Sequence, residues 1–183
     1  MTPIPNIRPK LKLPSFIGEI LRTLFFVVVV TILLDMAIPR SIVDGSSMQP
    51  TFEDGERLII SRVHYLFTPP ERGDVVVFNA VETRNHGEML IKRVIGIPGD
   101  MLEIRDRQVY INGTMIDEPY ILEACRINCN DDVWQLGMDE YFVMGDNRNH
   151  SNDSRSFAAV PLSNIIGRVI FRYWPPEDIS VFE

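Results

Sequence analysis

The sequence contains few cysteines and histidines for its 183 residues, which limits the chemistry it can support. Cys125 and Cys129 have no second cysteine pair, so a zinc site is not expected. Their spacing suits a short-loop disulfide in an oxidising compartment, but equally suits two free thiols. We expect surface roles for the three histidines, His64, His86 and His150. The sequence therefore predicts no metal and no other cofactor.

Positive charge is scarce outside the N-terminal region. Residues 1–40 contain five Lys/Arg and two acidic residues, a formal charge of +3. Residues 41–183 contain the other 13 basic and 23 acidic residues, a charge of −10. Nucleic-acid binders draw much of their affinity from neutralising phosphates, so the acidic body argues against a nucleic-acid partner. The basic N-terminal flank fits the cytoplasmic side of a membrane segment.

Long apolar runs are absent except at Phe16–Ile38. As a helix, this segment would be about 34 Å long, enough to cross a bilayer core. Its uncharged part, Thr23–Leu34, is short, so a cleavable signal peptide and a buried core helix are alternatives. We favour a retained span because no Ala-x-Ala-like cleavage site follows it and because charged residues near helix ends reach the interface. The predicted organisation is a cytoplasmic tail (1–15), a transmembrane helix (16–38) and an extracytoplasmic domain (39–183).

The body lacks a helical period of useful length. Short apolar runs alternate with turn residues, and Asn112-Gly113 is a strong hairpin signal. We therefore predict a mainly β body of antiparallel sheets, either packed or forming a partly closed barrel, with one N-terminal transmembrane helix. Residues 117–139 are expected to be irregular. The expected strands are Arg57–Val63, Asp74–Phe78, Met89–Ile95, Met101–Ile104, Gln108–Ile111, Thr114–Ile116, Glu140–Met144 and Ile165–Trp174.

Ser47 lies in a constrained loop shortly after the apolar segment. Gly45 permits backbone angles that other residues resist, and Pro50 keeps the residue before it out of the helical region. A serine on such a turn is a candidate nucleophile, although most loops of this composition are only turns.

Lys92 lies in the apolar strand expected at Met89–Ile95. Because side chains alternate along a strand, Lys92 shares one face with Leu90 and Val94. Lysines are rare on apolar faces, and desolvation would lower the pKa of Lys92 so that it could accept a proton from a serine. The alternative is an edge-strand lysine that reaches solvent.

The stretch Gly145–Arg155 follows an expected strand and is rich in side chains that form local hydrogen bonds. Within it, Asp153 and Arg155 can pair and stiffen the loop, and Ser151 can orient a nearby lysine. A solvated loop without a function is the alternative.

Together these stretches resemble the type I signal peptidases, which are membrane-bound serine–lysine endopeptidases. An N-terminal span and four motifs occur in the family's order. The motifs are Gly-Ser-Ser-Met-Gln-Pro-Thr at 45–51, Arg-Gly-Asp-Val-Val-Val-Phe at 72–78, Lys-Arg-Val-Ile-Gly-Ile-Pro-Gly-Asp at 92–100 and the stretch from Gly-Asp-Asn-Arg to Ser-Asn-Asp-Ser-Arg at 145–155.

The resemblance implies a role for each matching residue. Ser47 would be the nucleophile and Lys92 the general base, with Ser151 orienting the lysine and Met48 contributing to substrate binding. Gly45 stands where some members have a serine that helps to hold the oxyanion, so the oxyanion hole would rely on backbone N–H groups, with the Ser47 amide as the best candidate. The residues implied to support the site structurally are Gly145, Asp146, Asp153 and Arg155.

The resemblance also implies a substrate and a location. The partners would be exported precursor proteins carrying signal peptides, cut after small residues of an Ala-x-Ala site, and the lipid bilayer. The N-terminus would be cytoplasmic and the catalytic domain extracytoplasmic, at a bacterial plasma membrane or a thylakoid membrane. The fold implied is a mostly antiparallel β body with an apolar membrane-facing patch.

Three other functions fit parts of the sequence. One is a self-cleaving serine–lysine protein like the SOS repressors, against which the N-terminal span counts. Another is a Ser–His–Asp hydrolase that uses His150. The last is a membrane-anchored β-domain that binds partners without catalysis, in which replacing Ser47 would remove no activity.

Overall fold

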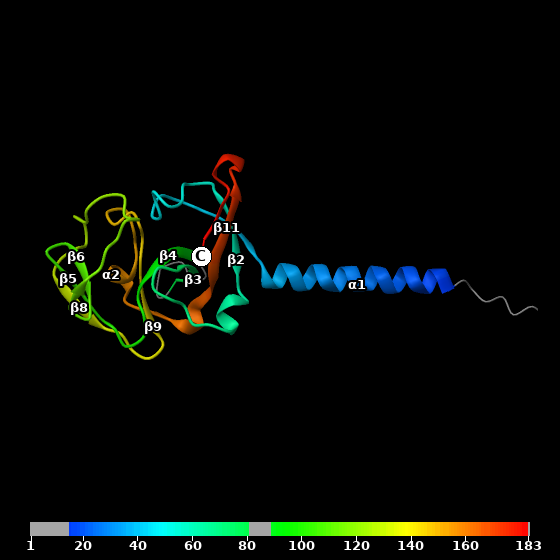
Figure 1. Cartoon of the computed structure of the whole chain (residues 1–183), viewed down its shortest axis with the longest axis horizontal. Helices are drawn as coiled ribbons and strands as arrows, with labels where there is room; N and C mark the ends of the chain where they lie inside the picture. Colours follow the sequence, from blue (N-terminus) through cyan, green and yellow to red (C-terminus); the bar gives the residue numbers. More distant parts are fainter. Residues whose placement is uncertain (1–14, 81–88, 183) are drawn as a thin grey trace, which may run out of the picture. The chain divides into compact units, whose positions relative to one another are not determined.

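A computed structural model describes residues 15–80 and 89–182 of the chain (Figure 1). It divides into two compact units, residues 1–36 and 37–183. His86 and the first 14 residues of the expected cytoplasmic tail lie outside the described residues.

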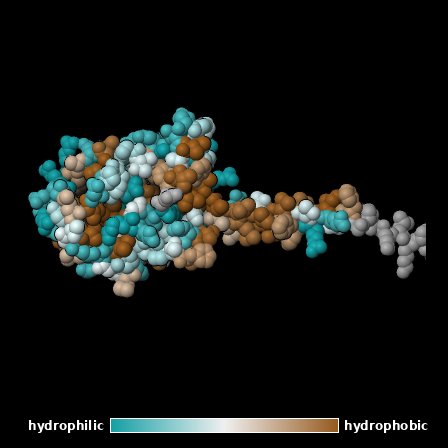
Figure 2. Space-filling view, in the orientation of Figure 1, coloured by the Kyte–Doolittle hydropathy of each residue, from teal (hydrophilic) through white to brown (hydrophobic). Residues whose placement is uncertain are grey.

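The N-terminal unit contains the helix α1, Ser15–Ala37. Its segment Phe16–Ala37 has a mean hydropathy of 2.3 and is long and apolar enough to cross a membrane. Figure 2 shows apolar side chains along most of this helix, whereas the visible face of the body mixes polar and apolar residues. Pro39 lies two residues after the last helical residue, Ala37, and proline disfavours helical backbone in the residue before it. A helix of this length and hydropathy fits a membrane protein.

The larger sheet of the body has eight strands within the described residues, and every pairing is antiparallel. Their order is β1-β2-β11-β3-β4-β9-β10, with β12 paired to β11. The strands are β1 (Arg40–Ile42), β2 (Arg57–Ser61), β3 (Val75–Asn79), β4 (Met89–Gly96), β9 (Glu140–Met144), β10 (Val160–Pro161), β11 (Ile165–Trp174) and β12 (Ser180–Val181).

The smaller sheet has four antiparallel strands in the described part of the chain, in the order β7-β6-β5-β8. They are β5 (Met101–Arg105), β6 (Gln108–Ile111), β7 (Thr114–Met115) and β8 (Asp132–Gln135). Figure 1 shows this sheet at one end of the body and the strands β2, β3, β4 and β11 at the other. The short helices are α2 (Ser154–Phe157), η1 (His64–Leu66), η2 (Leu162–Asn164) and η3 (Pro176–Asp178).

Apolar clusters hold the two sheets together and support the loops between them. One cluster joins Leu102 and Ile104 of the smaller sheet to Phe142 and Met144 of β9. Because β9 belongs to the larger sheet, this cluster fixes one sheet against the other. A second cluster lies between β2, β3 and β11 and includes residues of the loop after β1.

The prediction of a mainly antiparallel β body is confirmed, in the form of packed sheets that do not close into a barrel. The predicted hairpin is also confirmed: Asn112 and Gly113 have φ of 51° and 81°, as a two-residue turn requires, and join β6 to β7. The prediction that residues 117–139 are irregular is wrong for Asp132–Gln135, which form β8. This strand has only one half-buried residue and lacks apolar alternation, so its pairing with β5 decides its structure.

Candidate active site

The loop that carries Ser47 connects β1 to β2 and is closed by backbone hydrogen bonds. Val43 N donates to the Glu56 carbonyl at 2.8 Å, and Gly55 N donates to the Val43 carbonyl at 2.9 Å. Gly45 has φ of +88°, a left-handed conformation that glycine adopts without steric cost. The loop is therefore a defined structure rather than a loose connection.

Met48 and Phe52 fix the far side of this loop in the core. Phe52 N donates to the Met48 carbonyl at 2.9 Å, and both side chains are fully buried in the cluster beneath the larger sheet. Ser47 thus directly precedes an anchored side chain. Met48 also lines the cleft beside Ser47, and its role in substrate binding stays a prediction.

Lys92 meets Ser47 from the central strand β4. Its Nζ donates to Ser47 Oγ and to the Ile91 carbonyl, both at 2.8 Å. Lys92 is 3% exposed, and it is paired with Val76 across β3 and β4. Val94, two residues along β4, is fully buried in the neighbouring apolar cluster.

The backbone N–H of Ser47 is available as a donor. In the described part of the chain, no backbone or side-chain acceptor takes it. Gly45 N, by contrast, donates to Asp54 Oδ1 at 2.8 Å, so that amide is already engaged. Gly45 therefore shapes the loop, and an oxyanion role for the neighbouring Ser47 amide stays a prediction.

The loop after β9 contacts the loop that carries Ser47 through a buried carboxylate, Asp146. Arg93 of β4 binds Asp146 with two hydrogen bonds, Nε to Oδ1 at 2.8 Å and Nη2 to Oδ2 at 2.6 Å. Thr51 Oγ1 donates to the same carboxylate at 2.5 Å. Asp146 therefore connects the strand that carries Lys92 to the loop that carries Ser47.

Ser151 and Gly145 lie against the back of Ser47. A Cβ added at Gly145 would lie 2.5 Å from the Ser47 carbonyl oxygen and 2.6 Å from Ser151 Cβ, so only glycine fits there. Ser151 Oγ is buried and has no hydrogen-bond partner among the described residues. Its orienting action on Lys92 stays a prediction.

Asp153 and Arg155 form a buried ion pair that holds this loop. Arg155 Nε and Nη2 donate to the two Asp153 carboxylate oxygens at 2.8 and 2.7 Å, and the side chains are 2% and 0% exposed. Asp153 Oδ2 also accepts Gly145 N at 3.0 Å, and its other oxygen caps α2. One carboxylate thus fixes both ends of the loop that packs behind Ser47.

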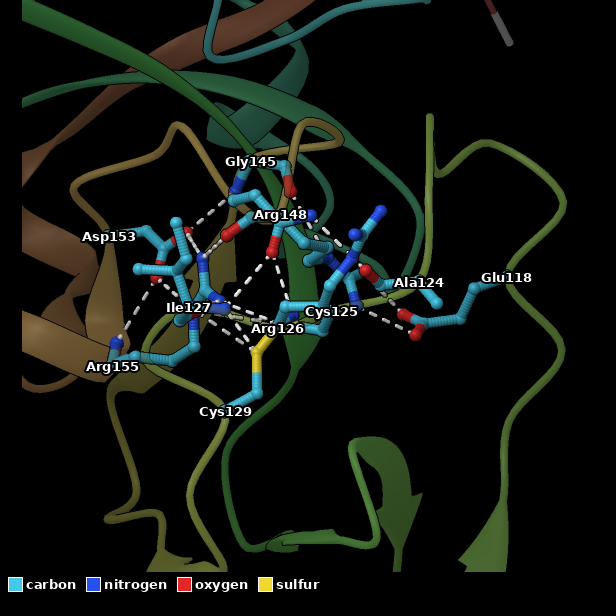
Figure 3. The surroundings of a disulfide bond; sticks show 11 residues. Glu118, Ala124, Cys125, Arg126, Ile127, Cys129, Gly145, Arg148, Asp153 and Arg155 are labelled. Atoms are coloured by element: carbon cyan, nitrogen blue, oxygen red, sulfur yellow. Dashed lines mark hydrogen bonds and ion pairs between the residues drawn. A yellow bond between two sulfur atoms is a disulfide. The ribbon is translucent and has the colours of Figure 1, made fainter.

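A disulfide lies directly beneath this pair. Cys125 and Cys129 are joined, with Cα atoms 6.0 Å apart, which answers a question that the sequence left open. Arg155 Nη1 donates to both sulfur atoms, at 3.1 and 3.2 Å. Figure 3 shows Arg155 between the sulfur atoms and Asp153.

The stretch between β7 and β8 covers the other side of the loop. Arg148, 2% exposed, donates to both oxygens of Glu118 at 2.7 and 2.6 Å. The Tyr120 hydroxyl donates to the same carboxylate at 3.0 Å. The Arg93 guanidinium lies over the Tyr120 ring, with Cζ 4.2 Å from the ring centroid. Burial, reinforced by the Glu118 charge, raises the pKa of Tyr120 above its usual range, so this phenol remains a neutral donor.

A cleft of about 160 Å³ opens beside Ser47 and Lys92. One wall comes from β1 and the residues after it, and the other from the first half of β4. Val77 and Met48 are among the apolar residues that line it. Residues 89–92 pair with β3 on one side, and none of the described strands pairs with their other edge. The cleft therefore combines an open strand edge with a serine and a buried lysine.

The structure brings all the predicted site residues into one region, from Ser47 and Lys92 to the loop Gly145–Arg155. His150 is exposed, and no hydrogen bond joins its ring to Ser47. In the residues described, no three His, Cys, Asp or Glu side chains are grouped as metal ligands.

Four residues at this site were not identified from the sequence. Three of them lie inside the quoted motifs: Thr51, Arg93 and Asn147. Membership of the same motifs as Ser47, Lys92 and Ser151 was a signal from which their place in the site could have been predicted. Tyr120 lies in a polar stretch without periodicity and gave no signal.

The comparisons with known proteins agree with this geometry. A family model described as "Signal peptidase, peptidase S26" matches residues 17–174. The chain belongs to the signal peptidase family. This match includes Ser47, Lys92 and the whole loop after β9, and it covers most of the chain.

Signal peptidases similar to the chain come from bacteria and from a plant. A probable signal peptidase I-2 of Synechocystis sp. is 39% identical over 142 residues, covering 76% of this chain and 64% of that protein. Thylakoidal processing peptidase 1 of Arabidopsis thaliana is 36% identical over 179 residues, covering 92% of this chain and 52% of that protein. The chain thus spans less than two thirds of the length of both.

A solved structure is also similar. It is a crystal structure of a signal peptidase I from Enterococcus faecalis, 30% identical, with a TM-score of 0.47. The similarity covers 55% of this chain and 97% of that structure.

We predict that Asp153 supports the site through stability. Asp153→Asn leaves Arg155 buried without a charged partner, which should lower the free energy of unfolding by about 3–5 kcal/mol. Glu103→Gln is the matched control, because its partner Arg105 is exposed to solvent and a pair of this kind contributes little to stability. Denaturant unfolding measures both, and proteolytic activity should fall together with stability. A fully stable but inactive Asp153→Asn protein would contradict a purely supporting role.

The disulfide should make a modest contribution to stability. Its cysteines are 4 residues apart, and closing so short a loop stabilises a fold by about 2 kcal/mol in the chain-entropy model. Replacing both cysteines by serine should lower the unfolding free energy by that amount. Dithiothreitol should have the same effect on the wild-type protein and none on the double variant. A wild-type protein that does not respond to the reductant would contradict this prediction.

Proposed function

We propose that this chain is a signal peptidase I, a membrane-bound endopeptidase that removes signal peptides with a Ser47 nucleophile and a Lys92 general base. The observation that carries the proposal is the 2.8 Å contact between Lys92 Nζ and Ser47 Oγ, with Lys92 almost fully buried. Family membership supports the same conclusion. The contact is within the range over which a base takes a proton from a nucleophile.

The mechanism uses Lys92 in both halves of the reaction. Neutral Lys92 removes the Ser47 proton as Oγ attacks the scissile carbonyl, and the Ser47 N–H stabilises the oxyanion. The resulting ammonium then gives its proton to the leaving amine, and the acyl-enzyme remains. Lys92 next takes a proton from water, which attacks the ester and releases the signal peptide while Ser47 regains its proton.

The cleft suits an extended peptide as the substrate. A chain segment lying between β1 and the open edge of residues 89–91 can form main-chain hydrogen bonds in the manner of an added strand. The cleft of about 160 Å³ limits the side chains that directly precede the cut to small ones, which supports an Ala-x-Ala site. The partners would be exported precursor proteins.

The helix α1 supports a location at the membrane. A precursor whose signal sequence lies in the same bilayer reaches the enzyme at a raised effective concentration. Arg8, Lys10 and Lys12 precede the helix, and such basic flanks favour the cytoplasmic side. The body would then lie outside the cytoplasm, or in the lumen if the membrane is a thylakoid.

Variants of the two central residues test the mechanism. Ser47→Ala, Lys92→Met and Lys92→Arg should each lower the cleavage rate by at least about 100-fold, because each removes the nucleophile or a base that can lose its proton. The assay uses the detergent-solubilised full chain and a precursor peptide with an Ala-x-Ala site. Thermal unfolding of the uncharged Lys92→Met protein separates lost chemistry from lost fold.

The matched control is His150→Ala, which should retain activity because the His150 side chain is exposed and its ring makes no hydrogen bond to Ser47. The wild-type rate should rise with pH, since only the neutral amine of Lys92 is a base. EDTA should leave the rate unchanged. An active Lys92→Arg protein together with an inactive His150→Ala protein would refute the serine–lysine mechanism in favour of a histidine-based hydrolase.

Membrane topology can be tested by protease protection. In sealed vesicles, protease on the cytoplasmic side should leave the body intact, and the same protease after detergent should digest it. The body is expected to be protected because the basic residues before α1 favour the cytoplasmic side of the membrane, which places the body on the opposite side. Recovery of a soluble form beginning after Ile38 would contradict a retained anchor.

A further inference from the structure

Asn147 holds the peptide that precedes the proposed nucleophile. Its side-chain Nδ2 donates to the Ser46 carbonyl at 3.1 Å, and its backbone N donates to the Ser47 carbonyl at 3.1 Å. Asn147 is 2% exposed. One buried residue therefore donates hydrogen bonds to two consecutive carbonyls, those of Ser46 and Ser47.

The first of these bonds determines the direction of an N–H group. The Ser46 carbonyl and the Ser47 N–H belong to one peptide unit, which is planar and, in this structure, trans. In a trans unit the C=O and N–H point in opposite directions. Fixing the Ser46 carbonyl toward Asn147 therefore fixes the Ser47 N–H away from it, where the described residues provide no acceptor.

We propose that Asn147 is a positioning residue that aims the Ser47 N–H at the oxyanion from behind the peptide plane. This inference rests on the proposed serine–lysine peptidase function. The hydrogen bond to the Ser46 carbonyl also polarises the peptide unit, which strengthens its N–H as a donor. Asn147 touches neither substrate nor reacting atoms and acts only through this peptide.

The surrounding contacts distinguish positioning from simple stabilisation. The Ser46 carbonyl also accepts Gln49 N at 3.2 Å, so it keeps a partner when the Asn147 amide is removed. The other amide atom, Asn147 Oδ1, is buried without a hydrogen-bond partner among the described residues. Replacing this side chain by an apolar one of similar shape thus orphans no group and removes an unsatisfied one.

Asn149 provides a matched control in the same loop. Its Oδ1 accepts Arg126 N and Ile127 N at 2.7 and 3.1 Å, and its Nδ2 donates to the Ala124 carbonyl at 3.1 Å. Asn149 therefore holds the disulfide segment rather than the nucleophile loop. Asn149→Leu leaves two backbone N–H groups without their acceptor, which is costly to stability.

The experiment compares Asn147→Leu, Asn147→Ala, Asn149→Leu and Ser47→Ala as detergent-solubilised full chains. With a precursor peptide carrying an Ala-x-Ala site, kcat should fall about 10- to 100-fold in both Asn147 variants, less than the loss from removing an oxyanion donor outright. KM should stay within about threefold. Affinity for the corresponding peptide aldehyde, which forms a tetrahedral adduct on serine, should fall in parallel with kcat.

The thermal unfolding midpoint should fall more in Asn149→Leu than in Asn147→Leu. The kcat should show the reverse, with Asn149→Leu retaining the higher value. An unchanged kcat at Asn147, or an equal loss of kcat at Asn149, would overturn the positioning role. If Asn147→Leu does not fold, Asn147→Ala provides the same comparison. Retained activity in Ser47→Ala would instead refute the proposed function itself, so the two failures are distinguishable.

Discussion

The bidentate ion pair between Arg93 and Asp146 is the interaction on which the arrangement of the site depends. Arg93 directly follows Lys92 on β4, so its position sets where the lysine emerges from the sheet. The same carboxylate accepts a hydrogen bond from Thr51 Oγ1, which lies in the loop that carries Ser47. A strand and two loops, far apart in the sequence, thus share one fully buried carboxylate. Removing either member of the ion pair would leave a buried charge without compensation, which makes alternative arrangements costly.

The loop Gly145–Arg155 extends this principle. It is polar and yet largely buried, which is stable only when every charge is paired and most hydrogen-bonding groups are satisfied. Asp153 is paired with Arg155 and Arg148 with Glu118, and the disulfide segment supplies further acceptors. The smaller sheet therefore contributes to the site by enclosing this loop. A loop held in this way can fix the position of the peptide that carries Ser47.

Sequence reasoning singled out Ser47 and Lys92 because their surroundings were unusual: a serine on a Gly- and Pro-constrained turn and a lysine on an apolar strand face. It also anticipated the hairpin at Asn112-Gly113, since that turn depends on local backbone preferences. It did not find β8, whose sequence has no alternation and which exists through pairing with β5. Nor did sequence reasoning assign a role to Asn147. An asparagine that donates to a carbonyl far away in the sequence has the same local sequence pattern as one that faces solvent.

The sequence by itself determined the β class, the apolar N-terminal helix, the acidic body and the motifs that contain Ser47 and Lys92. These properties follow from composition, periodicity and short-range spacing, which act between residues close in the chain. Only the tertiary structure decided that Lys92 Nζ lies 2.8 Å from Ser47 Oγ, that the cysteines pair beneath Arg155, and that Asn147 faces the Ser46 carbonyl. Such contacts join segments separated by up to 101 positions, and their geometry depends on how buried charges and backbone groups are satisfied together rather than on any local preference.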